Sequence, residues 1–126
     1  MAAVVTKTEE RIGSIKKITW AWTAHTDGKV ATTTTNAQTT YAYNGILERL
    51  VTVPDATDAP DDNYTVLVYD EDSTDTLMAA ATANRDTANT EQIAASSLGV
   101  VANDKLTLYI EGAGSGNKGT VHLYVR

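Results

Sequence analysis

The sequence contains no cysteine, which excludes disulfide bonds and thiolate metal sites. It also contains no phenylalanine, so we expect Trp20, Trp22 and some of the tyrosines to supply the aromatic part of the core. No run approaches the ~18 consecutive apolar residues of a membrane span. The N-terminal residues lack a basic region followed by a long apolar run, so we expect no signal peptide and synthesis in the cytoplasm.

Basic residues are also few, because 10 lysines and arginines stand against 16 acids and the formal net charge is −6. Nucleic-acid-binding proteins need a basic face for the phosphates, and anionic membranes attract basic segments. We therefore expect neither nucleic acid nor a membrane as a partner. The acidic balance favours solubility, or docking onto a surface of complementary charge.

What the sequence has in quantity is short runs of alternating apolar and polar residues, separated by polar turns. Turns recur about every ten residues, which predicts an all-β protein, an antiparallel β-sandwich or jelly roll of about seven to nine strands. The length of 126 residues suits one domain. We expect residues 13–126 to form this domain and residues 1–12 to be an N-terminal arm or a short strand.

The strongest strand signals lie at residues 14–23, 46–53, 64–69, 105–111 and 120–126. In the first of these, Ile18, Trp20 and Trp22 share one face, and we expect both indoles to be buried. The spacing in 46–53 would also fit a helix, but its β-branched end and Pro54 favour a strand. Residues 64–69 are apolar on both faces, which predicts a central position in a sheet.

Other segments give weaker signals. Asp27 and Gly28 suit a hairpin turn, and residues 30–35 after it have a thin apolar face, typical of an edge strand. We expect Leu77 and Met78 to begin a further strand, and the alanine-rich residues 79–98 to form a surface loop with subunit contacts. The glycine-rich residues 112–119 predict a hairpin loop.

Acidic residues gather in two neighbouring loops: Asp55, Asp58, Asp61 and Asp62 in the first, and Asp70, Glu71 and Asp72 in the second. Their oxygens could converge on calcium only if both loops lay at one end of the fold. The single strand between them separates them by some ~20 Å, and neither loop has the Asp-x-Asp-x-Asp-Gly pattern of a calcium site. The loops are better explained as solvated turns, and we expect no metal.

Other patterns for chemistry are equally weak. His25 and His122 are too few ligands for zinc in a chain without cysteine. No serine lies in a Gly-x-Ser-x-Gly turn, and residues 112–119 lack the Gly-Lys-Thr/Ser ending of a phosphate loop. We therefore expect no catalytic residue, no cofactor and no enzymatic activity. A sugar-binding module is an alternative, which exposure of Trp20 or Trp22 would favour and burial of both would weaken.

Four stretches carry a resemblance: GSIKKITWAW, VTVPDATDAPDDNYTVLVYDEDSTDTL, ANRDTANTEQI and the closing GNKGTVHLYVR. Together they resemble small structural proteins of tailed-bacteriophage virions, over most of the chain from Gly13 onward. Within that class the likeness favours capsid decoration, or cement, proteins. It implies a β-sandwich subunit, usually a homotrimer, that binds the major capsid protein on the outside of the mature head and stabilises it. Head–tail connector, tail and fibre proteins, or a sugar-binding adhesin module, are the alternatives.

For such a virion protein, synthesised in the cytoplasm of a bacterial host, we expect contacts through residues 2–11 and through residues 80–98. The candidate partner-contact residues are Val4, Val5, Arg11, Asn84, Arg85, Asp86, Asn89 and Glu91.

Overall fold

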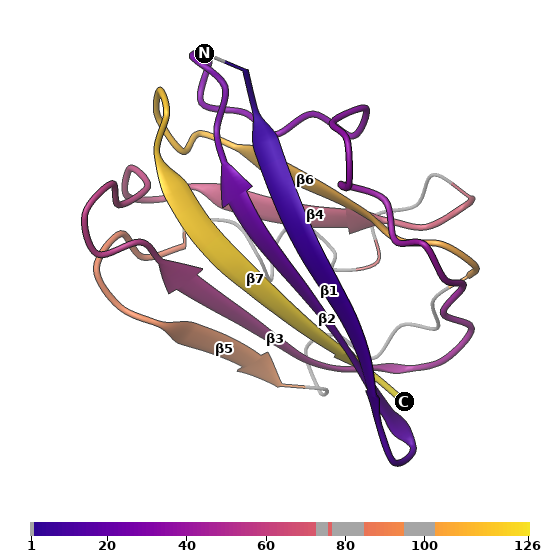
Figure 1. Cartoon of the computed structure of the whole chain (residues 1–126). Helices are drawn as coiled ribbons and strands as arrows, with labels where there is room; N and C mark the ends of the chain where they lie inside the picture. Colours follow the sequence, from indigo (N-terminus) through magenta and orange to yellow (C-terminus); the bar gives the residue numbers. More distant parts are fainter. Residues whose placement is uncertain (1, 73–75, 77–84, 95–102) are drawn as a thin grey trace.

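The computed structural model describes residues 2–72, 76, 85–94 and 103–126, which form seven β-strands and no helix (Figure 1). The strands are β1 (Val4–Ile12), β2 (Ile15–Thr23), β3 (Leu47–Pro54), β4 (Thr65–Tyr69), β5 (Glu91–Ala94), β6 (Thr107–Glu111) and β7 (Lys118–Val125). The predicted all-β, antiparallel class is therefore confirmed, as are the five strongest strand predictions, within two residues at their ends.

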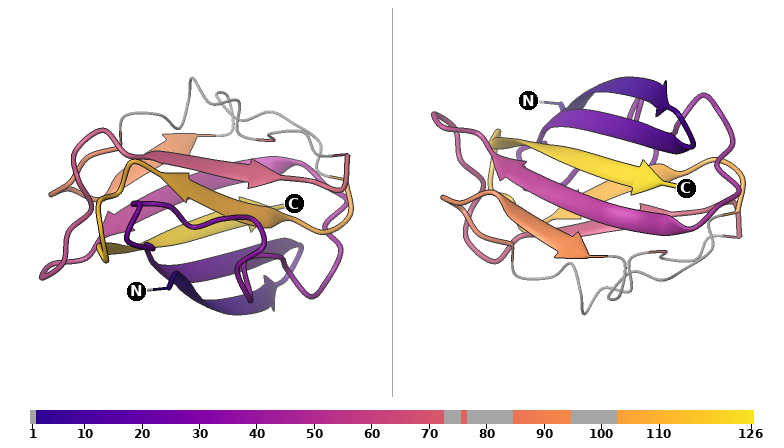
Figure 2. Two further views of the ribbon diagram at one scale, coloured as in Figure 1. Left: turned by 90° about the horizontal axis from the view of Figure 1, so that it is seen from above. Right: turned by 90° about the horizontal axis from the view of Figure 1, so that it is seen from below.

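Two antiparallel sheets contain these strands. The larger has the order β1-β2-β7-β3-β5, and the smaller pairs β4 with β6. The last strand, β7, thus lies between β2 and β3 in the middle of the larger sheet. In Figure 1 the smaller sheet lies behind the larger one and its strands cross those of the larger sheet, and Figure 2 shows the two layers from the side.

The core lies between the two sheets because strand residues alternate between faces. Trp20 and Trp22 of β2 have exposed fractions of 0% and 2%, so their predicted burial is confirmed. The indole Nε1 of Trp20 donates to the carbonyl of Ala37 (3.1 Å). Ala37 belongs to residues 30–38, the segment beside β6, so this bond links that segment to the larger sheet. The other fully buried residues of the core strands are Ile18, Leu47, Leu50, Val66, Val68, Leu108, Ile110, Val121, Leu123 and Val125.

Residues 1–12 were expected to be an arm or a short strand, and residues 4–12 form strand β1, paired with β2 along its whole length. Lys7 and Glu9 occupy inward positions, opposite Trp20 and Ile18. The ammonium of Lys7 donates to the carbonyl of Gln38 (2.9 Å) and lies 3.7 Å from the carboxylate of Glu9. This charged pair binds residues 38–43, which cover the inner side of the edge strand β1.

The carboxylate of Glu9 is the main anchor of that segment. It accepts hydrogen bonds from the backbone N–H groups of Thr40 (2.9 Å) and Tyr41 (3.1 Å), and from the hydroxyl of Tyr43 (2.8 Å). Burial alone would raise the pKa of Glu9, but these donors and Lys7 outweigh it and hold the pKa below its usual range. We call this arrangement the Glu9 anchor.

The prediction of an edge strand at residues 30–35 is wrong. Val30 and Gln38 each form one isolated bridge to β6, with Ile110 and Thr107, and the residues between them form turns. Gly28 has a φ of 80° in the preceding turn, as expected, but no hairpin follows. High β-propensity at the threonines does not suffice, because a thin apolar face leaves little to bury in a sheet.

Residues 64–69 contain strand β4, which pairs with β6, and Val66, Leu67 and Val68 of this strand are buried. Two further expectations need correction. Residues 112–119 are not a hairpin loop, because they join β6 of the smaller sheet to β7 of the larger. The expected loop at 79–98 contains strand β5, paired with β3. Its remaining residues, apart from 85–90, lie outside the described residues, as do Leu77 and Met78.

Candidate functional site

The predicted contact residues near the N-terminus differ in accessibility. Val5 is 3% exposed and pairs with Trp22, so its side chain belongs to the core of this chain. The adjacent Val4 and Val5 alone do not show in the sequence which of them faces inward. Val4 is 56% exposed, and Arg11 is exposed as well. These two remain available for contact.

The second predicted set forms a connected loop before and into β5. The guanidinium of Arg85 lies 3.4 Å from the carboxylate of Glu91, which also accepts the backbone N–H of Asp86 (2.8 Å). The carboxylate of Asp86 in turn accepts the backbone N–H of Asn89 (2.6 Å). Asn84 lies outside the described residues. Arg85, Asp86 and Glu91 therefore hold the loop in shape as well as lining its surface.

The two predicted sets do not form one site. Among the described strands, β1 and β5 are the outermost two of the larger sheet, four strand spacings apart, which corresponds to about 19 Å. Any partner that contacts both must span the sheet, or two partners must each contact one edge.

The broadest continuous surface is the outer face, which we define as the side of the larger sheet turned away from β4 and β6. At one end of it lie three isoleucines, which we call the apolar row. Ile12 pairs with Ile15, and Ile46 exchanges two backbone hydrogen bonds with Arg126, the residue after Val125 of β7. Ile12 is 58% exposed and Ile46 48%.

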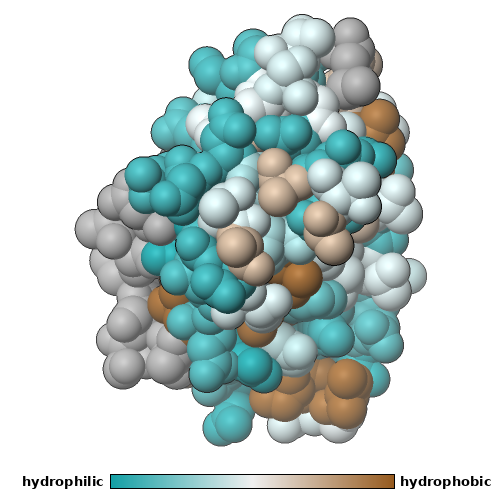
Figure 3. Space-filling view, turned by 90° about the vertical axis from the view of Figure 1, so that its left-hand side faces the viewer, coloured by the Kyte–Doolittle hydropathy of each residue, from teal (hydrophilic) through white to brown (hydrophobic). Residues whose placement is uncertain are grey.

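Ile12 and Ile15 are direct neighbours, and Arg126 lies between Ile15 and Ile46 at this end of the face. Exposed apolar surface that is gathered in one region marks interaction sites. In Figure 3 hydrophobic surface gathers at the lower end of the molecule, where Figure 1 places the turn between β1 and β2 and the C-terminus. Tyr41, 65% exposed, lies near this end, in a hollow that it shares with Arg11 and Lys16.

Next to the apolar row, the register of three strands stacks two cations on one ring. Tyr124 of β7 pairs with Lys17 of β2 on one side and with Arg49 of β3 on the other. The ammonium of Lys17 lies 5.6 Å from the ring centroid, and the guanidinium carbon of Arg49 lies 5.5 Å from it. Both distances fit cation–π contacts. We call these three residues the cationic row.

The same positive charge affects His122, which lies two residues before Tyr124 on β7. His122 pairs with Thr19, and its Nδ1 lies 3.0 Å from the hydroxyl oxygen of that threonine. Burial, and then the positive charges of Lys17 and Arg49, lower the pKa of His122. Lys17 and Arg49 thus concentrate positive charge around Tyr124, and Glu10, the partner of Lys17 on β1, is an acid beside them on the same face.

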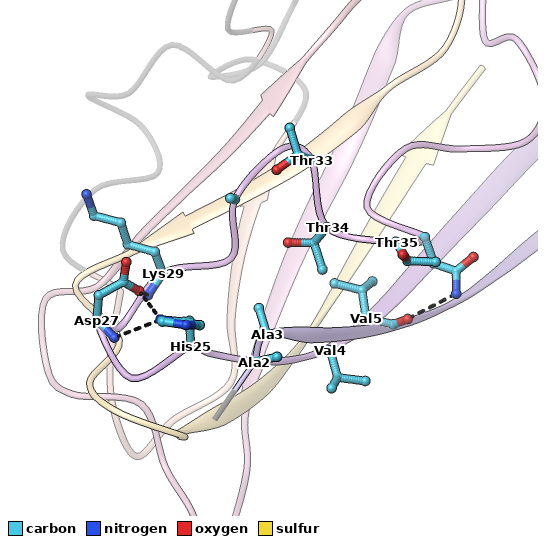
Figure 4. A pocket seen from close by; sticks show the side chains of 12 residues that line it. Ala2, Ala3, Val4, Val5, His25, Asp27, Lys29, Thr33, Thr34 and Thr35 are labelled. Atoms are coloured by element: carbon cyan, nitrogen blue, oxygen red, sulfur yellow. Dashed lines mark hydrogen bonds and ion pairs between the residues drawn. The ribbon is translucent and has the colours of Figure 1, made fainter.

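A hollow of about 640 Å³ lies between the start of β1 and the loop of residues 31–36 (Figure 4). Short side chains form its walls, with Ala3 and Val5 facing Thr34. At one end the imidazole of His25 lies 3.4 Å from the carboxylate of Asp27. The charged groups at this end engage one another, and the hollow offers small apolar and hydroxyl-bearing walls.

The acidic loops behave as the sequence predicts for turns. Hydrogen bonds from the backbone N–H groups of Asp58 and Thr57 lower the pKa of Asp55, and Asp70 accepts the backbone N–H of Asp72. The loops flank β4 at its two ends. Within the part of the chain that the structure describes, no three histidine or acidic side chains group as metal ligands would.

Burial of Trp20 and Trp22 weakens the sugar-binding alternative, which exposure of either would have favoured. No helix among the described residues is long and apolar enough to cross a membrane. Comparison with known proteins found no matching family model, no matching curated protein and no matching solved structure.

Proposed function

We propose that the protein is a structural component of a tailed-phage virion, a capsid decoration protein that binds the major capsid protein on the outer surface of the mature head. Its activity is adhesion, without catalysis or a cofactor. Connector, tail or fibre roles within the virion are the alternatives, and they would use the same kind of contact surface.

Two antiparallel sheets enclosing one core support the finer assignment of the fold, a β-sandwich. A sandwich suits this role because its strands form a stable body while a whole sheet face remains available for contact.

The observation that carries the proposal is the outer face. The apolar row supplies surface that gains free energy when it is covered, through the exposed Ile12 and Ile46. The cationic row beside it supplies charge and an aromatic ring, through Lys17, Tyr124 and Arg49. Aromatic residues and arginine are enriched at the centres of protein interfaces, and charges of one sign select a complementary partner. The partner surface is therefore acidic with apolar depressions.

The two edges of the larger sheet support the trimer. A closed ring of identical subunits needs two different patches on each subunit that contact each other head to tail. Val4 and Arg11 lie on one edge strand, and the loop of residues 85–91 adjoins the other. In the ring that we propose, the β1 edge of one subunit contacts the β5 edge of the next.

Binding would stabilise the head by mass action, because the protein binds the expanded shell and not its dissociated subunits. Three linked subunits multiply a modest affinity at each site. A surface of moderate size on each subunit is therefore sufficient.

The experiment mixes the protein with empty mature heads assembled without it, and measures cosedimentation and coating by electron microscopy. We expect Arg49→Glu to weaken binding at least about tenfold, since it reverses a charge at the centre of the outer face. Lys29→Glu makes the same charge change at an exposed loop position away from this face and should leave binding unchanged. Coating of tails instead of heads would favour the alternative virion roles, and absence of coating by the wild type would refute the proposal.

A further inference from the structure

The smaller sheet carries a second hollow, lined by the outward residues of β4 and β6 and by the segment beside β6. Its volume is about 590 Å³. The residues that line it are Thr32, Gln38, Tyr69, Asp70, Glu71, Thr107 and Tyr109. We call it the tyrosine groove. It lies on the opposite sheet from the outer face, so it belongs to neither predicted contact set nor to the proposed capsid-binding surface.

The two tyrosines of the groove form a corner and not a platform. Tyr69 and Tyr109 occupy diagonal positions on β4 and β6, with ring centroids 6.3 Å apart and ring planes at 64°. A flat sugar ring stacks best on one open aromatic face or on coplanar rings. A cation instead gains from two ring faces that meet at an angle, since each face is electron-rich.

The charge of the groove has one sign. Its lining includes the carboxylates of Asp70 and Glu71, and no lysine, arginine or histidine among the described residues lines it. Glu71 is held towards the groove by the side-chain amide of Gln38, which donates to its Oε1 at 3.2 Å. A cation can pair with the carboxylate of Glu71, whereas a neutral ligand cannot.

Two neighbouring groups are consistent with a negative potential at the groove. The hydroxyl of Tyr109 donates to the carboxylate of Glu111 (3.2 Å), and burial, followed by the charge of Glu111, raises the pKa of Tyr109. Lys7 contacts Gln38, one of the residues that line the groove. Its ammonium donates to the backbone carbonyl of Gln38 from the core side and pairs with the carboxylate of Glu9. Its side chain is only 14% exposed, so it is already engaged elsewhere.

We propose that the tyrosine groove binds an arginine side chain of a partner protein. The guanidinium would lie in the corner between the rings of Tyr69 and Tyr109 and donate to the carboxylate of Glu71. Arginine fits better than lysine because its planar guanidinium stacks on an aromatic face and donates to a carboxylate in the same plane.

The test is a titration of the full-length, ¹⁵N-labelled protein, followed by NMR, with a capped glycyl-arginyl-glycine peptide. The control ligand is the same peptide with citrulline, which has the shape of arginine without its charge. We expect the arginine peptide to shift the amide resonances of residues 69–71 and 107–109 with a Kd of about 1–10 mM, the range for a single anchoring side chain. The citrulline peptide should bind at least about tenfold more weakly, because it lacks the charge.

Variants separate the parts of the site. Glu71→Gln should weaken binding of the arginine peptide about five- to tenfold, and Tyr109→Leu by a similar factor, because each removes one partner of the cation. Tyr109→Phe keeps the ring and loses only the hydroxyl, so it should bind within about twofold of the wild type. Glu71 is exposed, so Glu71→Gln keeps the test valid even if Tyr109→Leu fails to fold.

Three results would overturn the proposal. They are equal binding of the citrulline peptide, absence of shifts at residues 69–71 and 107–109 up to about 20 mM peptide, and shifts of the same resonances by a neutral monosaccharide at that concentration. The last result would identify a sugar site. None of these outcomes depends on whether the protein coats phage heads.

Discussion

The Glu9 anchor makes the sharpest prediction about stability. Glu9→Ala removes a carboxylate whose side chain is only 7% exposed and which accepts three hydrogen bonds. The change leaves the hydroxyl of Tyr43, a residue that is 5% exposed, and two backbone N–H groups without their acceptor. We expect the free energy of unfolding to fall by about 3–4 kcal/mol, within the range for breaking a buried charged network.

This magnitude follows from the individual contacts. Hydrogen bonds to charged groups contribute about 1.5–3 kcal/mol each, but part of that offsets the cost of burying the carboxylate. Tyr43→Phe, which removes one donor, should therefore cost about 1 kcal/mol. In a double-mutant cycle with Glu9→Gln, the two changes should be less than additive by about 1 kcal/mol, because both remove the same hydrogen bond.

Urea denaturation at pH 7, followed by circular dichroism, measures these changes, with the slope of the transition as a check that the unfolded state is unaltered. Glu10→Ala is the matched control, since Glu10 is the next residue on the strand, exposed and on the other face. It should change stability by no more than about 0.5 kcal/mol. A loss below about 1 kcal/mol for Glu9→Ala, at unchanged slope, would refute the anchor.

Acid titration tests the same carboxylate independently. Because folding lowers the pKa of Glu9, its contribution is fully present above the unfolded-state pKa and is lost as pH falls through the folded-state pKa. The stability difference between wild type and Glu9→Gln should therefore shrink as pH falls from about 5 to about 3. A difference that stays constant over this range would contradict the assignment.

Three further predictions concern the core. Deleting residues 121–126 removes most of the central strand β7 and should abolish cooperative unfolding; a melting temperature near that of the wild type would contradict this. Burial raises the pKa of Tyr64 to about 12, so stability should be lost as pH rises from about 10 to 12, and less steeply in Tyr64→Phe by denaturant titration. Gly119→Ala should cost about 2–3 kcal/mol in urea denaturation, because the added Cβ would lie 2.7 Å from a ring carbon of the buried Trp22; no measurable loss would show that the ring can move.

Strand β3 shows how a local irregularity hides a simple pattern. Leu47 and Leu50 both face the core although three positions separate them, a spacing that alternation in a strand forbids and a helix allows. The register shifts between Leu47 and Arg49, opposite Val125 and Tyr124, and this bulge restores both leucines to the inner face. The strand itself was predictable from its β-branched end and Pro54, but the bulge was not.

Connections were less predictable than strands. Residues 112–119 have the composition of a hairpin loop, and glycines at 112, 114 and 116 do adopt positive φ there. Composition indicates that the chain turns, but not which sheet the next strand joins. That choice depends on pairing between distant strands, which puts β7 between β2 and β3 instead of beside β6.

The candidate sites were least accessible to sequence reasoning because they depend on register. Lys17, Arg49 and Tyr124 come from three strands separated by up to about a hundred positions, and each alone is an ordinary polar residue of a strand. The tyrosine groove likewise combines β4, β6 and the segment beside them. Alternation did predict the inward faces of β2, β6 and β7, and so which residues of these three strands were available for such rows.

The difference between inward and outward strand positions shows where in the chain functional residues should be sought. Inward positions are constrained by packing, so Val121, Leu123 and Val125 carry little information beyond the need to fill the core. Outward positions of a strand tolerate almost any residue of adequate β-propensity, and threonine would satisfy folding and solubility at each. Neither folding nor solubility requires a tyrosine between two cations at position 124. Neither requires exposed isoleucines at the end of the same face. Residues that folding does not demand, gathered by register into adjacent rows, are therefore the strongest physical argument that the outer face contacts a partner.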